Sequence, residues 1–106
     1  MSDVVLVLTT MPDDGAAETI ARTLVDEQLA ACVNLLAPMT SIYRWKGAVE
    51  RDTERQLLMK TTRTQVPALE RRLKELHSYE LPEFLVLDVA GGSDAYLAWV
   101  SGTSAG

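Results

Sequence analysis

The chain has 106 residues, of which 47% are hydrophobic and 24% are charged, and its formal net charge is -5 at pH 7. This length and composition predict one globular domain, residues 1–106, and exclude a disordered chain. An acidic protein repels phosphate backbones, so nucleic acid is not an expected partner. No apolar run approaches the roughly 20 residues that span a bilayer, so we expect no membrane partner. A single cysteine allows no intrachain disulfide, and the N-terminal residues lack a signal-peptide pattern, so we expect a cytoplasmic protein.

The sequence begins with a strand pattern followed by an amphipathic helix pattern. Val4–Leu8 is a continuous, mostly β-branched apolar run, which predicts a buried strand over residues 3–10. Apolar side chains then recur at helical spacing and predict a helix over residues 14–29, with Asp13 or Asp14 as its N-cap. The apolar positions are Ala17, Ile20, Ala21, Leu24, Val25 and Leu29.

The middle of the chain predicts a long β-hairpin. Its two strands are expected over residues 31–46 and 48–62, joined by a tight turn at Lys46–Ala48. Pro38 interrupts the first strand and predicts a bend or an unpaired edge. The charged run Glu50–Arg55 is interpreted as a solvated, projecting tip of the hairpin.

The last third predicts a helix, a strand and a final helix. The first helix is expected over residues 65–77, with Thr64 as its cap and Pro67 in its first turn. A strand over residues 83–90 follows, and Ser93 then caps a helix over residues 93–101. Residues 101–106 are expected to form a flexible tail.

This order of elements predicts an α+β fold of the ferredoxin-like, split βαβ type, with an additional C-terminal helix. Two strand-helix-strand halves are joined by the hairpin, and both helices cover the same face of one sheet. The first and last strands are apolar at nearly every position, although helices cover only one side. We therefore expect neighbouring chains to cover the second face, which favours an oligomer.

A series of short sequence blocks spans Val4 to about Val100. The blocks are Ala31–Asn34, Ser41–Gly47, Glu54, Lys60–Thr62, His77, Tyr79–Glu80, Pro82–Glu83 and Tyr96–Trp99. They closely resemble the CutA family of divalent-cation tolerance proteins. The resemblance implies a cytoplasmic homotrimer that takes part in tolerance of copper and other divalent cations, with no enzymatic activity. We expect the hairpin strands to pair with those of neighbouring chains in this trimer.

His77 is the only histidine and directly follows the apolar stripe of the second predicted helix. From the residues alone it is either a copper ligand or a side chain stabilised by the negative end of the helix dipole. The resemblance implies a metal role, in which Glu80 and Glu83 are candidate oxygen ligands. Some family members bind copper through a cysteine that ends the first strand and a His-His pair that ends the second helix. The matching positions here are Thr9, Leu76 and His77, so we expect copper to bind weakly.

Other polar and aromatic side chains within these blocks are candidates for a cleft or a subunit interface: Tyr43, Trp45, Lys60 and Tyr79. The sequence leaves open whether these aromatic side chains line a ligand cleft or anchor an interface. Lys60 lies in an apolar strand and is expected to pair with a carboxylate. Cys32 is expected to be a buried structural thiol.

Three functions follow from these observations. The first is a homotrimer that binds divalent cations, particularly copper, in metal tolerance. The alternative is a trimeric, small-ligand-sensing regulator resembling nitrogen-signalling proteins. The third is a small enzyme similar to ferredoxin-like acylphosphatases, but the sequence has no phosphate-cradling glycine loop and no nucleophile-base order, so we expect no enzyme.

Overall fold

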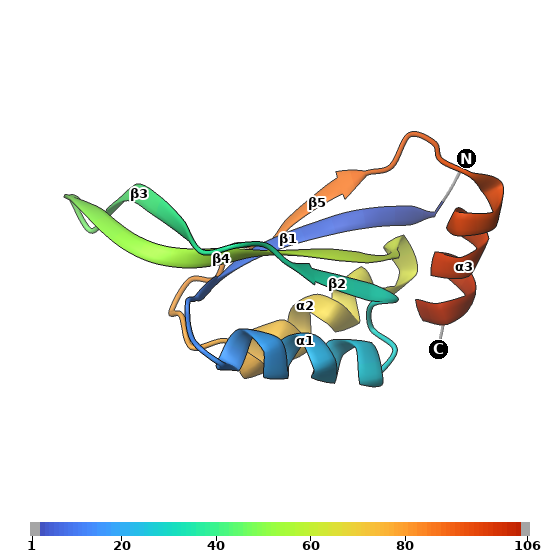
Figure 1. The fold of residues 1–106 in the computed structure, drawn as a ribbon, viewed down its shortest axis with the longest axis horizontal. Helices are drawn as coiled ribbons and strands as arrows, with labels where there is room; N and C mark the ends of the chain where they lie inside the picture. Colours follow the sequence, from blue (N-terminus) through green and yellow to red (C-terminus); the bar gives the residue numbers. More distant parts are fainter. Residues whose placement is uncertain (1–2, 105–106) are drawn as a thin grey trace.

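A computed structural model describes residues 3–104, in which one antiparallel sheet carries two helices on one face and a third at one end (Figure 1). The strands are ordered β2-β4-β1-β5, and β3 pairs with the far part of β4. The elements are β1 (Val4–Pro12), α1 (Ala16–Asp26), β2 (Cys32–Leu35), β3 (Met39–Trp45), β4 (Ala48–Thr62), the 3-10 turn η1 (Arg63–Gln65), α2 (Val66–Leu76), β5 (Leu85–Asp88) and α3 (Asp94–Ser104). This strand order is that of a split βαβ sandwich, so the predicted fold is confirmed.

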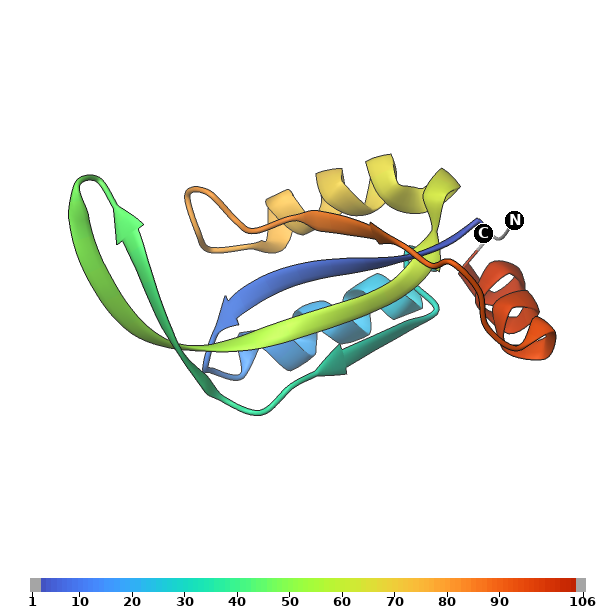
Figure 2. The same ribbon diagram turned by 90° about the horizontal axis from the view of Figure 1, so that it is seen from above.

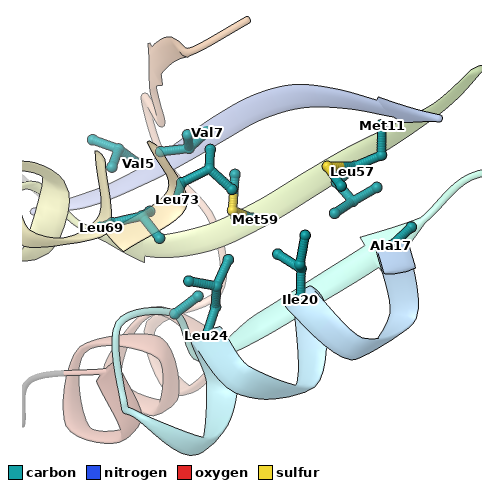
Figure 3. Close-up of a cluster of buried hydrophobic side chains, with 11 residues drawn as sticks. Val5, Val7, Met11, Ala17, Ile20, Leu24, Leu57, Met59, Leu69 and Leu73 are labelled. Atoms are coloured by element: carbon teal, nitrogen blue, oxygen red, sulfur yellow. The ribbon is translucent and has the colours of Figure 1, made fainter. Parts of the chain in front are cut away.

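The core lies between the sheet and helices α1 and α2. Successive side chains of a strand point to opposite faces, and the odd-numbered side chains of β1 and β4 point to the helices. Leu57, Met59, Leu69 and Leu73 are at most 1% exposed there (Figure 3). Burying a side chain of this size stabilises the fold by roughly 1.5–3 kcal/mol.

The other face of the sheet is largely open and is called the open face below. Register places Leu6, Leu8 and Leu58 on it, next to Leu85 and Leu87 of β5. Helix α3 packs over one end only, where Val100 lies in a small cluster with residues of β1 and the α1–β2 connection. Leu85 is 54% exposed and Leu87 is 42% exposed, so an apolar surface remains uncovered in the single chain.

The β3–β4 hairpin extends beyond the rest of the sheet and gives the chain an elongated shape of 44 × 26 × 24 Å (Figure 2). Its two-residue turn is formed by Lys46 and Gly47, whose φ angles are +50° and +84°. Two positive φ angles match the right-handed twist of the flanking strands and favour glycine at the second position. The predicted turn is confirmed, but Ala48 already belongs to β4.

The charged run Glu50–Arg55 is exposed from Glu50 to Thr53 on the projecting hairpin, as predicted, but not at its last two residues. It lies within β4, paired with β3, and Glu54 is only 7% exposed. Arg55 donates hydrogen bonds to the carbonyl oxygens of Leu35 (3.3 Å) and Leu36 (2.8 Å). Arg55 thus satisfies backbone carbonyl groups where β2 ends and the segment between β2 and β3, which contains Pro38, begins. The single strand predicted over 31–46 is therefore two strands in the structure.

Several predicted element ends are corrected. Helix α1 ends before the positive φ of Gln28, and β5 is shorter than the strand predicted over 83–90. Thr64 lies inside the 3-10 turn and caps no helix, whereas the Ser93 hydroxyl accepts a hydrogen bond from the Tyr96 amide as predicted. Helix α3 continues to Ser104, so the tail prediction is wrong for 101–104; residues 105–106 lie outside the described residues. No helix within residues 3–104 is long and apolar enough to cross a bilayer.

Candidate functional site

A cleft of about 640 Å³ lies on the open face, where the hairpin leaves the sheet. Its walls come from β3, from β4 and from the link 77–84 that joins α2 to β5. This link lies at the same end of the molecule as the hairpin (Figure 2). The side chains that line the cleft include Tyr43, Trp45, Glu54, Gln56, Tyr79 and Glu83.

The hairpin wall of the cleft is aromatic. Tyr43 and Trp45 alternate with Arg44 along β3, so they lie on the same face of the strand. The Tyr43 hydroxyl donates a hydrogen bond to Asp52 on the paired strand. This hydrogen bond, together with desolvation and neighbouring carboxylates, raises the pKa of Tyr43 to about 12. Tyr43 is therefore a neutral donor at physiological pH.

The floor of the cleft contains a buried carboxylate. The Tyr79 hydroxyl donates a hydrogen bond of 2.7 Å to Glu54 Oε2, which joins the link to β4. Burial raises the pKa of Tyr79, and the hydrogen bond to Glu54 raises it further. The phenol thus stays protonated and supplies a neutral donor to Glu54, which is 7% exposed.

Gln56 fastens the other end of the link to the sheet. Its Nε2 donates to the carbonyl oxygen of Thr9 at 2.7 Å and to Glu83 Oε2 at 2.8 Å. One side-chain amide therefore fixes Glu83 relative to β1. At the mouth of the cleft, Lys46 Nζ lies 3.6 Å from Glu80 Oε2, and both of these side chains are about 70% exposed.

His77 is buried, and both of its ring nitrogens are engaged. Nε2 lies 2.7 Å from the carbonyl oxygen of Thr10, and Nδ1 accepts a hydrogen bond of 3.1 Å from the Tyr79 amide. Because Nδ1 is an acceptor, this network assigns the proton to Nε2. The ring also packs against the Tyr79 ring in a tilted arrangement, with centroids 4.7 Å apart and an interplanar angle of 44°. His77 thus positions the link and has no unused nitrogen in this conformation.

The predicted metal ligands do not form a preassembled centre. Within residues 3–104, no group of three or more His, Cys, Asp or Glu side chains is placed to hold a metal ion. The hydroxyl of Thr9 is fully buried without a hydrogen-bond partner among the described residues, and Leu76 packs against the core. A hydroxyl and an alkyl side chain cannot replace thiolate and imidazole ligands for copper. The donor set present fits only a weak site.

Lys60 and Cys32 lie away from the cleft. Lys60 Nζ is 5.6 Å from the centroid of the Tyr96 ring, and no ion pair joins it to a carboxylate among residues 3–104. The predicted ion pair is therefore wrong, since an aromatic face takes its place. Cys32 is partly exposed and not buried, and it pairs across β2 and β4 with Lys60.

The sequence analysis did not single out Glu54 or Gln56 as site residues. The sequence did contain the information needed to find Glu54, because the turn at Lys46–Gly47 determines which residues of β3 and β4 pair. Extending that register places Met39 opposite Glu54, on the face that carries Tyr43 and Trp45.

Comparison with known proteins agrees with this fold. Residues 5–103 match the family described as CutA1 divalent ion tolerance protein. The chain belongs to the CutA1 family. It is 49% identical over 100 residues to the divalent-cation tolerance protein CutA of Thermus thermophilus, covering 94% of this chain and 95% of that protein.

Solved CutA structures share the architecture. The crystal structure of CutA from Xylella fastidiosa superposes with a TM-score of 0.92 at 46% identity, covering 96% of this chain and 98% of that one. The periplasmic divalent cation tolerance protein CutA of Archaeoglobus fulgidus gives a TM-score of 0.91 at 31% identity, covering 95% and 98%. The CutA1 resemblance inferred from the sequence blocks is thereby confirmed.

Proposed function

We propose that this CutA1 protein is a non-enzymatic, cytoplasmic homotrimer that binds divalent cations weakly, copper among them, in metal tolerance. The observation that carries the proposal is the set of carboxylates at one cleft: Glu54, Glu80 and Glu83. They lie in a chain whose formal net charge is -5, so the local field favours cations.

Weak binding follows from the hydrogen bonds that these groups already make. Glu54 accepts from Tyr79, Glu83 accepts from Gln56, and Glu80 pairs with Lys46. A copper ion that uses His77 must displace either the Thr10 carbonyl or the Tyr79 amide from the ring. Each displaced hydrogen bond subtracts from the metal affinity.

The open face supports the homotrimer. Leu85 and Leu87 expose apolar surface on this face, and β5 is an edge strand of the described sheet, paired only with β1. Uncovered edges and apolar patches of this kind favour association between chains. The projecting β3–β4 hairpin offers strands that a neighbouring chain can pair with.

Two measurements test the proposal. Light scattering at micromolar concentration should give about three times the chain mass of 11.6 kDa. A cell that loses this protein should grow less well than its parent in medium with added copper. A mass of one chain would refute the trimer, and equal growth would refute the role in tolerance.

The alternative function, a small-ligand-sensing regulator resembling nitrogen-signalling proteins, is favoured by the size of the cleft. Its volume of about 640 Å³ is within the range of small-molecule sites, roughly 300–1,000 Å³. A thermal-shift screen with copper, zinc and nucleotides separates the two functions. A ligand at a hundred times its dissociation constant stabilises the folded protein by about 2.7 kcal/mol.

A further inference from the structure

We propose that the cleft binds an organic dication, a short linear diamine, between the Trp45 indole and the carboxylates of Glu54 and Glu83. This inference goes beyond the proposed function, because its ligand is not an inorganic ion and its binding does not require His77. Three features of the cleft carry it: an ammonium group already bound at the mouth, uncompensated carboxylates inside, and aromatic walls.

The chain's own Lys46 shows what the mouth of the cleft recognises. Its Nζ lies 5.5 Å from the centroid of the Trp45 ring and 3.6 Å from Glu80 Oε2. An ammonium within about 6 Å of an indole face is attracted by the ring quadrupole. The mouth of the cleft thus holds an alkylammonium between a ring face and a carboxylate.

The inner carboxylates have only neutral partners. Glu54 accepts from the Tyr79 phenol, and Glu83 accepts from the Gln56 amide. Neither forms an ion pair with any residue in the described part of the chain. Glu54 is 7% exposed and Glu83 is partly exposed. Burial of a carboxylate without a cation costs free energy, so a cation that enters the cleft is stabilised beside Glu54 in particular.

The aromatic walls favour an organic cation over a bare metal ion. Tyr43, Trp45 and Tyr79 line the cleft, and its volume of about 640 Å³ greatly exceeds that of one ion. A methylene chain gains by packing on rings, whereas a metal ion can bind only weakly here, because no group of three or more ligands converges among the described residues. Two ammonium groups match two inner carboxylates.

Lys46 then acts as a tethered competitor for the ring and for Glu80. Removing its charge should tighten diamine binding. The replacement must tolerate the left-handed backbone of this position, where φ is +50°, so Lys46→Asn is the suitable variant. Lys74→Gln is its matched control, because Lys74 carries the same charge but pairs with Glu70 on helix α2, and α2 does not line the cleft.

Calorimetric titration of the full chain with 1,4-diaminobutane, in buffer with EDTA, tests the proposal. The neutral isostere 1,4-butanediol should not bind. Trp45→Leu should weaken diamine binding about fivefold, whereas Trp45→Phe, which keeps a ring, should stay within about twofold of the wild type. Glu83→Gln, which keeps the shape but removes a charge, should weaken it about tenfold. Lys46→Asn should tighten it about threefold, and Lys74→Gln should leave it unchanged.

The proposal is overturned if the wild type gives no diamine binding, or if the diol binds equally well. It is also overturned if Glu83→Gln binds as tightly as the wild type, a test that stands even where Trp45→Leu fails to fold. Equal tightening by Lys46→Asn and Lys74→Gln would show a general charge effect and not a site. Since EDTA removes metal ions, failure here is distinct from failure of copper binding.

Discussion

The Nε2 atom of His77 lies 2.7 Å from the carbonyl oxygen of Thr10, which joins the end of helix α2 to the end of strand β1. The second ring nitrogen accepts from the Tyr79 amide, so the same imidazole also orients the first residues of the link. Tyr79 and Glu83, which line the cleft, both belong to this link. His77 is therefore part of the framework that shapes the cleft.

Replacing His77 by Ala should destabilise the protein. The change leaves the Thr10 carbonyl without this donor and removes a ring that is 9% exposed, which together should cost about 1–3 kcal/mol. Urea unfolding measures this difference. Ser78→Ala, at the exposed neighbouring position, is the control and should stay within about 0.5 kcal/mol of the wild type. Equal stabilities of His77→Ala and the wild type would contradict the framework role.

The two tyrosines of the cleft should differ sharply in their contribution to stability. Tyr79→Phe removes the phenol that donates a hydrogen bond to the buried Glu54 and should cost about 1–3 kcal/mol. Tyr43→Phe removes a comparable phenol, but Tyr43 is 40% exposed and water can replace it at Asp52, so the loss should stay below about 0.5 kcal/mol. Denaturant unfolding of both variants decides this, and a larger loss for Tyr43→Phe would be the opposite of what we expect.

The contact between α1 and α2 should give a pH-dependent contribution to stability. Arg72 donates two hydrogen bonds of 2.9 Å to the Glu27 carboxylate, and this bonding holds the pKa of Glu27 below its ordinary value of 4.5. Since the folded pKa is lowered, the contribution is present above the ordinary value and is lost as pH falls through the folded value. The stability difference between the wild type and Glu27→Gln should therefore shrink below about pH 4.5.

Thermal unfolding between pH 3 and 7 measures this effect. Glu18→Gln is the control, because the ion pair of Glu18 with Arg22 lies within one helix and is exposed. The Glu18 side chain is 67% exposed and the Arg22 side chain is 79% exposed. A difference between Glu27→Gln and the wild type that grows toward acid would have the wrong sign.

Introducing a charge on the open face should dissociate the proposed trimer. Leu87→Glu places a carboxylate in the apolar patch of β5, where a neighbouring chain would have to bury it. Light scattering should then show the mass of one chain, 11.6 kDa, at concentrations where the wild type is trimeric. Val25→Glu, which adds the same charge at an exposed position of α1, should leave the assembly unchanged. Dissociation by both variants would point to a general effect of charge.

The spacing of apolar residues along the chain and the residues at the turns were enough to predict the fold. The apolar run Val4–Leu8, the helical spacing over 14–29 and the turn at Lys46–Gly47 each predicted the type of element that the structure contains, although α1 itself spans only Ala16–Asp26. Element ends were less predictable, because they depend on tertiary hydrogen bonds. At the end of β2, for example, Arg55 donates hydrogen bonds to the carbonyl oxygens of Leu35 and Leu36. This contact joins residues about 20 positions apart, so no local sequence pattern predicts it.

The site was only partly predictable for a related reason. Tyr43, Trp45, Tyr79, Glu80 and Glu83 line one cleft of the single chain, whereas Lys60, the fourth residue predicted for a cleft or interface with Tyr43, Trp45 and Tyr79, does not. Glu54 was hidden within a charged run, where composition alone suggests solvent exposure. The burial of His77 depends on contacts with β1, 67 residues away in sequence, which spacing along the chain cannot show.

Copper titration of the wild type and His77→Ala tests the central claim most directly. Both proteins should be confirmed as folded by circular dichroism, then titrated calorimetrically at neutral and at mildly acidic pH. We expect weak binding by the wild type that is further weakened in acid, because protons compete with a metal ion for its ligands. His77→Ala should lose most of this binding. Equal copper binding by the two proteins would contradict the assignment of His77 as a ligand and place the metal elsewhere.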